Sequence, residues 1–579
     1  MTVTRRHPVP SDLAIAQETT LLPIEEIAER LGVFDEELLP YGHVMAKIDA
    51  AAVLRRRAAA PDGKFITVTA ITPTPLGEGK TVTSLGLGQA LAQLRHRVCN
   101  VLREPSKGPT FGIKGGACGG GYSQMLPMEN INLHFTGDIH AVESAQNLAA
   151  AAIDATLMHG NPLGLDPLSV TWPRCVDAND RALRDIVVGL GGRLNGLPRQ
   201  TGYSITAATE TAAIHSLAGD LGDLRERFGR TVVGFTPDGK PVSCEDLKVA
   251  GAMTALLADA LMPNLVQSTE NHPVLCHGFP FANVAHGNSS VIAAKVARKL
   301  ADYVISESGF GSDCGFAKLM DVVVRQTPGL TVAGAVIVAT VRALKQHGGA
   351  FRLRPGMAYS KVKEAAEAEN LPAVEAGCRS NLAAHINIVH SYGVPVIVAI
   401  NRFTSDTDAE LELVRRLALD LGAEAAVVHD AWGQGGEGAL ALARAVIQVT
   451  ERPVENRFFY AADASIEEKI EATATRLYGA DGVDYSPLAK ERIRLYTNLG
   501  YNTLALNVAK THLSLTDDSG KTGAPTGWRL FIRDIRASVG AGFLYPLAGE
   551  FPTMPGLPSR PAFMAVDVDL KTGKIKGLF

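Results

Sequence analysis

Residues 64–91 read KFITVTAITPTPLGEGKTVTSLGLGQAL, and this stretch decides the fold. Its first part alternates apolar and β-branched side chains, with Ile66 and Val68 on one alternation, in the pattern of a buried strand. Prolines and glycines then predict a loop, and a helix is expected to begin at Lys80. Strand, loop and helix N-terminus together form an anion site, because backbone N–H groups and the helix dipole attract negative charge. The stretch predicts an α/β fold with a mostly parallel sheet.

The loop at residues 74–81 resembles the phosphate-binding loop of P-loop NTPases, with one departure. The pattern G-x-x-x-x-G-K-[ST] has glycine six residues before its lysine, where this chain has Thr74. Lys80 is placed to reach the β- and γ-phosphates, and the Thr81 hydroxyl to coordinate Mg²⁺. The other interpretation is a turn that carries a lysine by chance. The flanking strand and helix favour nucleotide binding by Thr74, Pro75, Leu76, Gly77, Glu78, Gly79, Lys80 and Thr81.

Composition limits the class of protein. The 579 residues, 46% hydrophobic and 20% charged, carry a net charge of −4, which gives no indication of a nucleic-acid-binding surface. The N-terminal residues lack the apolar core of a secretory signal, and no apolar run could span a bilayer. The seven cysteines include no C-x-x-C pair, so disulfides and structural zinc are not expected. We expect a cytoplasmic protein that binds neither nucleic acid nor membranes.

A second candidate group ends the next predicted strand, residues 97–104. Ligands of open α/β sheets collect at the carboxyl ends of strands, so Arg103 is expected near the phosphate loop. An arginine there can hold a carboxylate or a phosphate with a forked pair of hydrogen bonds. The alternative is a surface ion pair between Arg103 and its neighbour Glu104, and the strand pattern favours neither.

Residues 112–122, GIKGGACGGGY, are dense in glycine. A flexible linker would carry more serine and fewer large side chains, so a linker is disfavoured. Dense glycine instead lets the backbone approach a ligand closely and form N–H concavities for anions. Lys114 within the run, and Asp138 shortly after it, could add a cation and a carboxylate to the same neighbourhood.

Further short apolar runs predict more strands of a parallel sheet, at residues 231–236, 303–308, 333–340 and 395–401. The composition turns helical from about residue 361, which suggests a domain boundary there. We predict a large P-loop domain and two smaller α/β domains, over residues 1–360, 361–460 and 461–579.

A loop-rich stretch contains His272, His277 and His286. No acidic residue or cysteine lies at ligand spacing from them, so packing and hydrogen bonding are expected rather than a transition metal.

Several motifs together resemble the formate–tetrahydrofolate ligase family, also called formyltetrahydrofolate synthetases. PTPLGEGKT at 73–81 resembles the family's P-T-P-x-G-E-G-K-[ST], while residues 112–122 and VATVRALKQHGG at 338–349 resemble its two signatures. FTGDIHA at 135–141 and GEFPTMPGLPSRPAF at 549–563 also match. One departure is Ala317, which stands before Lys318 where the family is expected to carry an acidic residue. It leaves open the role of that loop, which includes Asp313.

The resemblance implies a ligase that converts ATP, formate and tetrahydrofolate to ADP, phosphate and 10-formyltetrahydrofolate. Formate itself would have to expel oxide, so it is first phosphorylated to formyl phosphate, whose leaving group is phosphate. Lys80 and Thr81 would hold Mg-ATP, and Arg103 would orient formate and then formyl phosphate. Asp138 would hydrogen-bond the pterin or help to remove the N10 proton, while a role for Lys114 is conjectural.

The family also binds a pterin, and two aromatic residues that follow predicted strands suit stacking on it, Trp432 first and Phe403 after it. A homotetramer and activation by a monovalent cation, K⁺ or NH₄⁺, are further implications of the resemblance.

Two other functions share part of this pattern. A P-loop switch ATPase that acts on a protein partner would share residues 64–103 but would need neither signature nor a pair of stacking aromatics. A different ATP-dependent carboxylate ligase would accept acetate or a biotin precursor in place of formate.

Overall fold

A computed structural model describes residues 4–112, 118–354 and 356–578. Within these residues the largest element is a sheet of 12 strands. Its order is β1 (Leu38–Pro40), β2 (Ala46–Ile48), β13 (Asn264–Ser268), β14 (Pro273–Cys276), β4 (Val98–Leu102), β15 (Tyr303–Glu307), β3 (Lys64–Ala70), β16 (Val332–Ala339), β17 (Val396–Asn401) and β18 (Ala425–His429). Off this path, β6 (Ser123–Leu126) pairs with β13, and β5 (Gly119–Gly120) with β6. Lys114 lies outside the described residues.

The strands from β14 to β18 all run parallel. The phosphate-loop strand β3 lies among them, with Val68 paired to Glu307 of β15 and to Val336 of β16. Apart from the outer strand β18, which is partly exposed, these strands are buried on both faces, which is why their sequences are nearly continuous apolar runs. The predicted α/β fold with a mostly parallel sheet is confirmed.

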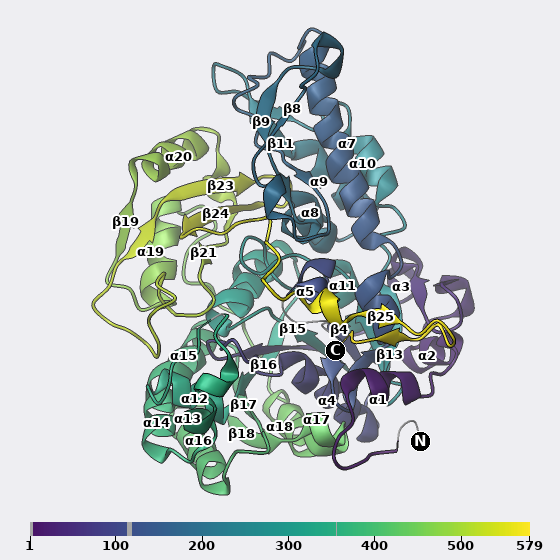
Figure 1. Ribbon diagram of the computed structural model, residues 1–579, viewed down its shortest axis with the longest axis vertical. Helices are drawn as coiled ribbons and strands as arrows, with labels where there is room; N and C mark the ends of the chain where they lie inside the picture. Colours follow the sequence, from purple (N-terminus) through teal and green to yellow (C-terminus); the bar gives the residue numbers. More distant parts are fainter. Residues whose placement is uncertain (1–3, 113–117, 355, 579) are drawn as a thin grey trace.

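Helices cover both faces of the parallel strands (Figure 1). On one face, Ile66 and Val68 share an apolar cluster with α4 (Lys80–Gln93) and α18 (Leu440–Val449). On the other, Phe65 and Ile337 belong to the large cluster that includes α11 (Val291–Leu300), α12 (Val341–His347) and α15 (Ala383–Ser391). The other helices around the sheet are α1 (Asp12–Glu18), α2 (Ile24–Leu31), α3 (Ala50–Arg56), α5 (Lys107–Phe111), α6 (Met128–Leu133), α13 (Lys363–Glu367), α14 (Leu371–Gly377), α16 (Asp408–Asp420) and α17 (Ala431–Gln434).

A second part rises from the sheet on the long helix α7 (Asp138–Met158), seen at the top of Figure 1. It contains α8 (Glu210–Leu217), α9 (Leu221–Arg230), α10 (Ala250–Leu256) and the short strands β7 (Arg174–Cys175), β8 (Ile186–Val188), β9 (Arg199–Thr201), β10 (Tyr203–Ser204), β11 (Val232–Phe235) and β12 (Pro241–Ser243). The run at 231–236 was expected in the parallel sheet, and this expectation was wrong. It forms β11, which pairs antiparallel with β12 in a hairpin outside that sheet.

A third part carries the C-terminal sheets. It contains α19 (Ile466–Arg476), α20 (Pro487–Asn498), β19 (Val483–Tyr485), β20 (Ala505–Leu506), β21 (Ala509–Lys510), β22 (Leu530–Ile532), β23 (Asp534–Ser538) and β24 (Phe543–Ala548). The chain then returns to the N-terminal region as a hairpin of β25 (Asp567–Val568) and β26 (Ile575–Lys576), where Gln17 donates to the Ile575 carbonyl at 3.0 Å (Figure 1).

The predicted limit at residues 360/361 falls between β16 and β17, which pair along one sheet from Ala335–Val396 to Ala339–Ile400. Strands on both sides of that limit thus share a single core. No helix in the described ranges is long and apolar enough to cross a membrane.

Candidate active site

The phosphate loop joins the carboxyl end of β3 to the N-terminus of α4. Gly77 and Gly79 have φ of +74° and +76°, a left-handed conformation that side chains other than glycine rarely adopt. A Cβ on Gly79 would also collide with the Asn401 side chain. The loop therefore needs glycine at these two positions, and it leads directly into the amide groups of the first turn of α4.

Side chains close the loop where the usual glycine is replaced. The Thr74 N–H and hydroxyl both donate to Oε1 of Glu78, at 2.8 and 2.9 Å. Oε2 of Glu78 accepts from the Thr340 hydroxyl at 2.5 Å, and its carbonyl accepts from Asn401 Nδ2 at 3.1 Å. Glu78 is thus a buried brace that joins the loop to the ends of β16 and β17.

Lys80 and Thr81 open helix α4, as the sequence predicts. Both are partly buried. The Thr81 hydroxyl donates to Oε2 of Glu307 at 2.7 Å, and Glu307 is the last residue of the neighbouring strand β15. Sequence reasoning missed Glu307 as a member of this site.

Arg103 follows β4, the strand on the other side of β15. Its Nη1 donates to the Pro280 carbonyl at a long 3.4 Å. Gly309 lies against the guanidinium, since a Cβ there would come within 3.3 Å of Nη2. Burial lowers the pKa of Arg103 and the Glu307 carboxylate partly offsets this shift, but an arginine stays charged. The strand order therefore brings the phosphate loop, Glu307 and Arg103 to one edge of the sheet.

Glu104 turns away from this edge. Among the described residues it forms no ion pair with Arg103, and its buried Oε2 has no hydrogen-bond partner. It lines a separate cavity of about 140 Å³ with Lys107, His134 and His140. Burial, with the nearby Asp138, raises the pKa of Glu104 well above its usual value.

Asp138, predicted to touch the pterin, is fully buried at the start of α7. Its Oδ1 accepts from Lys47 Nζ at 2.7 Å and its Oδ2 from Asn264 Nδ2 at 2.7 Å. Burial alone would raise the pKa of Asp138, but Lys47 and two histidines hold that pKa below its usual range. These contacts fit a structural ion pair, which leaves the carboxylate no exposed face.

The histidines of the loop-rich stretch are buried. His277 and His215 lie with Asp138 so that one ligand atom of each falls within 4.8 Å of the others. Nε2 of each imidazole donates to the Ala260 carbonyl, at 2.7 and 2.8 Å, so neither nitrogen is available to a metal. Nε2 of His272 donates to Oδ1 of Asn100 at 2.6 Å.

The loop that departs from the family pattern is also internally paired. Asp313 accepts from Lys510 Nζ at 2.5 Å, and Lys318 donates to the Ala282 and Asn283 carbonyls. The Lys318 ammonium group thus has hydrogen-bond acceptors without an acidic residue at position 317.

The described part of the glycine run, residues 118–122, contacts the backbone of Trp432. Tyr122 N–H donates to the Trp432 carbonyl at 2.9 Å, and a Cβ on Gly121 would collide with the same carbonyl. From the other side, Asp12 accepts from the Gly121 N–H at 2.7 Å and the Tyr122 hydroxyl accepts from the Arg6 N–H at 2.7 Å. The indole of Trp432 is 38% exposed at the start of α17, so it is open to a ligand.

Arg342 connects Phe403 to the phosphate loop, and the sequence did not indicate this arginine. Arg342 donates to the Gly77 carbonyl at 2.8 Å, and its guanidinium lies 3.8 Å from the centre of the Phe403 ring. Phe403 follows β17 and Trp432 follows β18, neighbouring strands whose last residues, Asn401 and His429, are paired. Both predicted aromatics thus come after the carboxyl ends of their strands, at the same edge of the sheet as the phosphate loop.

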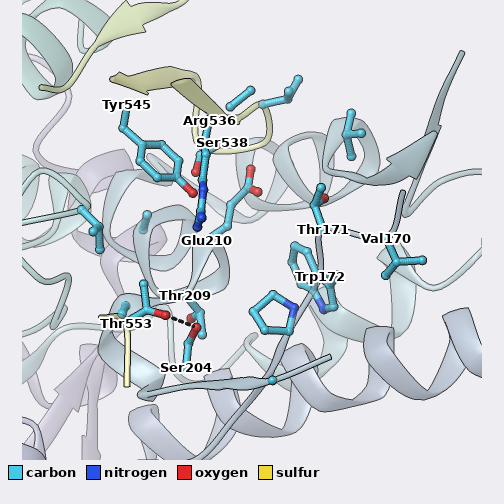
Figure 2. Close-up of a pocket in the computed structure, with 18 of the residues that line it drawn as sticks. Val170, Thr171, Trp172, Ser204, Thr209, Glu210, Arg536, Ser538, Tyr545 and Thr553 are labelled. Atoms are coloured by element: carbon cyan, nitrogen blue, oxygen red, sulfur yellow. Dashed lines mark hydrogen bonds between the residues drawn. The ribbon is translucent and has the colours of Figure 1, made fainter. Parts of the chain in front are cut away.

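A larger cavity of about 500 Å³ lies elsewhere, between the part built on α7 and the C-terminal sheet (Figure 2). Figure 2 shows Thr209, Glu210, Arg536 and Tyr545 around this cavity. The Ser204 hydroxyl donates a hydrogen bond to the Thr553 hydroxyl at 3.0 Å. Its lining includes no residue of the phosphate loop, nor Arg103, Phe403 or Trp432.

Known proteins resemble this chain along nearly its whole length. The family model described as formate–tetrahydrofolate ligase matches residues 10–579. The chain is 54% identical over 571 residues to the formate–tetrahydrofolate ligase of Desulforamulus reducens, covering 99% of this chain and 100% of the relative. It is 50% identical over 572 residues to that of Saccharopolyspora erythraea and over 568 residues to that of Roseiflexus castenholzii, covering 98% of this chain and 100% of each relative.

Proposed function

Since the chain belongs to the formate–tetrahydrofolate ligase family, we propose that it joins formate to N10 of tetrahydrofolate, with conversion of ATP to ADP and phosphate. The product is 10-formyltetrahydrofolate, and the intermediate is formyl phosphate. The observation that carries this proposal is the order β4–β15–β3, which brings Arg103 and the phosphate loop to one edge of the sheet.

The phosphate loop binds the triphosphate. Its glycine-shaped backbone and the first turn of α4 present N–H groups, and Lys80 adds positive charge beside the β- and γ-phosphates. The Mg²⁺ that accompanies the nucleotide neutralises charge on the phosphate oxygens, and the Thr81 hydroxyl is an oxygen donor suited to it. Because the Glu78 brace fixes the loop before the nucleotide arrives, little reorganisation is needed on binding.

Arg103 orients the acid. Its guanidinium has room for a forked contact to formate, since among the described residues its one hydrogen bond is the long one to the Pro280 carbonyl. One formate oxygen attacks the γ-phosphorus, the bond from that phosphorus to the ADP oxygen breaks, and ADP leaves. The charge of Arg103 then holds the formyl phosphate in place.

The folate completes the reaction. Trp432 and Phe403 would hold the flat pterin, and the N10 lone pair attacks the formyl carbon. The tetrahedral adduct collapses with cleavage of the C–O bond to phosphate, and the departing phosphate takes up the N10 proton. Arg342 contacts both the phosphate loop and Phe403, so it holds the nucleotide-binding and folate-binding parts of the site at a fixed distance from each other.

One assay tests the proposal. The purified protein is given Mg-ATP, formate and tetrahydrofolate, and the product is read as methenyl absorbance after acid treatment. We expect turnover only when all three substrates are present. With ¹⁸O-labelled formate, a single label should appear in the released phosphate, because a formate oxygen bridges carbon and phosphorus in the intermediate. ATP hydrolysis that needs neither formate nor folate, and responds to a protein partner, would instead support a switch ATPase.

The family resemblance also leads us to propose a homotetramer activated by K⁺ or NH₄⁺. Light scattering coupled to size exclusion measures the mass of the assembly. Assays in matched Na⁺, K⁺ and NH₄⁺ salts measure the activation.

A further inference from the structure

We propose that His347 and Asn381 are positioning residues, which couple the phosphate loop to residues 511–529 of the C-terminal part. Through them, nucleotide binding at the loop and ordering of residues 511–529 favour each other. This inference rests on the proposed nucleotide-binding function. It also gives a role to the histidine of the signature at 338–349.

The signature at 338–349 forms the end of β16 and helix α12, whose side chains contact the phosphate loop. Thr340 and Arg342 bond the middle of the loop, through Glu78 and the Gly77 carbonyl. His347 bonds its beginning, since Nε2 of the ring donates to the Thr72 carbonyl at 2.9 Å, two residues after β3 ends. The signature helix therefore holds the loop along most of its length.

Asn381 bonds Thr72 from a different element. It lies in a π-helical turn, Cys378–Leu382, between α14 and α15. Its Oδ1 accepts from the Thr72 N–H at 3.1 Å, and its Nδ2 donates to the Thr72 hydroxyl at 2.9 Å. Thr72, Asn381 and His347 are all buried, so water does not compete for these hydrogen bonds.

The same two side chains also bond Gly523, which belongs to the long loop between β21 and β22. Nδ2 of Asn381 donates to the Gly523 carbonyl at 3.0 Å, and Nδ1 of His347 accepts from the Gly523 N–H at 3.3 Å. Glycine suits this position, because its φ of +73° is left-handed and a Cβ would come within 3.2 Å of the Ser380 hydroxyl oxygen. Residues 511–529 are all described and contain no helix or strand, and loops of this length are usually functional.

His347 makes both contacts as a neutral imidazole. A carbonyl only accepts, so Nε2 carries the proton, and an amide N–H only donates, so Nδ1 offers its lone pair. Burial lowers the pKa of His347, which keeps the ring in this state. A shift of either Thr72 or Gly523 would leave buried polar groups without partners, which is costly. The two segments therefore move together.

Hydrogen exchange followed by mass spectrometry tests the coupling, with saturating ADP and Mg²⁺ as the probe. In the wild type, ADP should slow exchange in peptides covering residues 519–527 by at least about threefold, because a fixed Thr72 also fixes Gly523. His347→Leu removes both contacts at similar size, so ADP should no longer slow this exchange. The variant should also bind ADP about fivefold to tenfold more weakly.

Asn381→Leu should weaken ADP binding by a similar factor, and its matched control is Asn456→Leu. Asn456 likewise bonds both backbone groups of one residue, accepting from the Val332 N–H at 2.8 Å and donating to its carbonyl at 3.1 Å. Val332 lies at the amino end of β16, away from the phosphate loop. The control should change neither the ADP affinity nor the effect of ADP on exchange.

Steady-state assays separate positioning from a general loss of stability. Both His347→Leu and Asn381→Leu should raise the KM for ATP, while the KM for formate changes by less than about twofold, because the formate contact at Arg103 is intact. A merely structural role would lower the amount of active enzyme and leave both KM values unchanged. The exchange measurement on the wild type does not depend on whether the variants fold.

Three results would overturn the coupling. The first is exchange at residues 519–527 of the wild type that ADP does not slow. The second is equal slowing by ADP in His347→Leu and in the wild type, which indicates that the nucleotide acts on these residues directly. The third is an ADP affinity in both variants equal to that of the wild type. If the wild type binds no ADP at all, the proposed function itself fails, and the coupling fails with it.

Discussion

Thr74 and Glu78 close the phosphate loop with two hydrogen bonds to one carboxylate oxygen, at 2.8 and 2.9 Å. This relationship explains why the chain departs from the P-loop pattern at its first glycine. Where other loops rely on glycine for their shape, this one uses a hydroxyl and a buried carboxylate. The same carboxylate extends the brace to Thr340, so the loop is tied to the next strand of the sheet.

Thr74→Gly restores the P-loop pattern and should nevertheless weaken nucleotide binding. The variant loses the hydroxyl bond to Glu78 and gains backbone freedom, which together cost about 1–2 kcal/mol. Calorimetric titration with ADP measures the change. Thr74→Ser keeps the hydroxyl and is the control, which should bind as the wild type does. Equal affinity in the glycine variant would show that the brace does not matter for binding.

Arg103→Ala should bind ATP within a few fold of the wild type and lose formylation by about 10²-fold or more, because a preorganised charge at the reacting group is removed. Arg103→Lys should recover little, since lysine cannot form the fork. Steady-state rates at varied formate, with ATP affinity measured separately, check this. Near-normal turnover in the alanine variant would remove Arg103 from the mechanism.

Trp432→Ala should raise the folate KM about tenfold and leave the formate KM nearly unchanged, because a stacking surface worth about 1–1.5 kcal/mol is lost. Its indole is exposed, so the fold should tolerate the change. Phe531→Ala, at an exposed phenylalanine of β22, is the control and should affect neither constant. An unchanged folate KM would mean that Trp432 only packs.

Asp138→Asn should lower stability, by about 3–5 kcal/mol, because Lys47 would be left buried without its counter-charge. Chemical unfolding followed by circular dichroism measures this loss, and the activity of the remaining folded fraction is measured beside it. A variant as stable as the wild type but inactive would argue for the proton-transfer role that the sequence suggested.

Asp321 should make stability depend on pH. It is buried, accepts from the Tyr392 hydroxyl at 2.8 Å, and burial raises its pKa to about 7. The folded state therefore holds a proton that the unfolded state releases near pH 4, so this contribution is full below about pH 4 and is lost as the pH rises to about 7. Its size is on the order of 4 kcal/mol.

Asp321→Asn lacks that titration. Its melting temperature relative to the wild type should therefore rise between pH 5 and pH 8, as measured by thermal unfolding in both buffers. Asp420→Asn, at an exposed helix end, should show no such trend. A constant difference between Asp321→Asn and the wild type would contradict the assignment.

Local patterns predicted the central strand and the phosphate loop, because each depends on neighbours within a few residues. Arg103 was expected beside the loop from the general rule that ligands collect at the carboxyl ends of parallel strands. Glu307 was not predicted, since its contact with Thr81 joins residues 226 apart in the chain. The burial of Asp138 was not predicted, because it depends on Lys47, which comes from β2. A short apolar run cannot tell a central strand from a hairpin, and β11 is such a run.

The N-terminal segment reaches across the chain to brace the backbone behind Trp432, through the contacts of Arg6 and Asp12 with Tyr122 and Gly121. An affinity tag or a proteolytic cut near residue 12 would therefore loosen the glycine turn that supports the indole, although neither aromatic residue of the proposed pterin stack is altered. Protein prepared with an intact, untagged N-terminus should give the more faithful folate affinity.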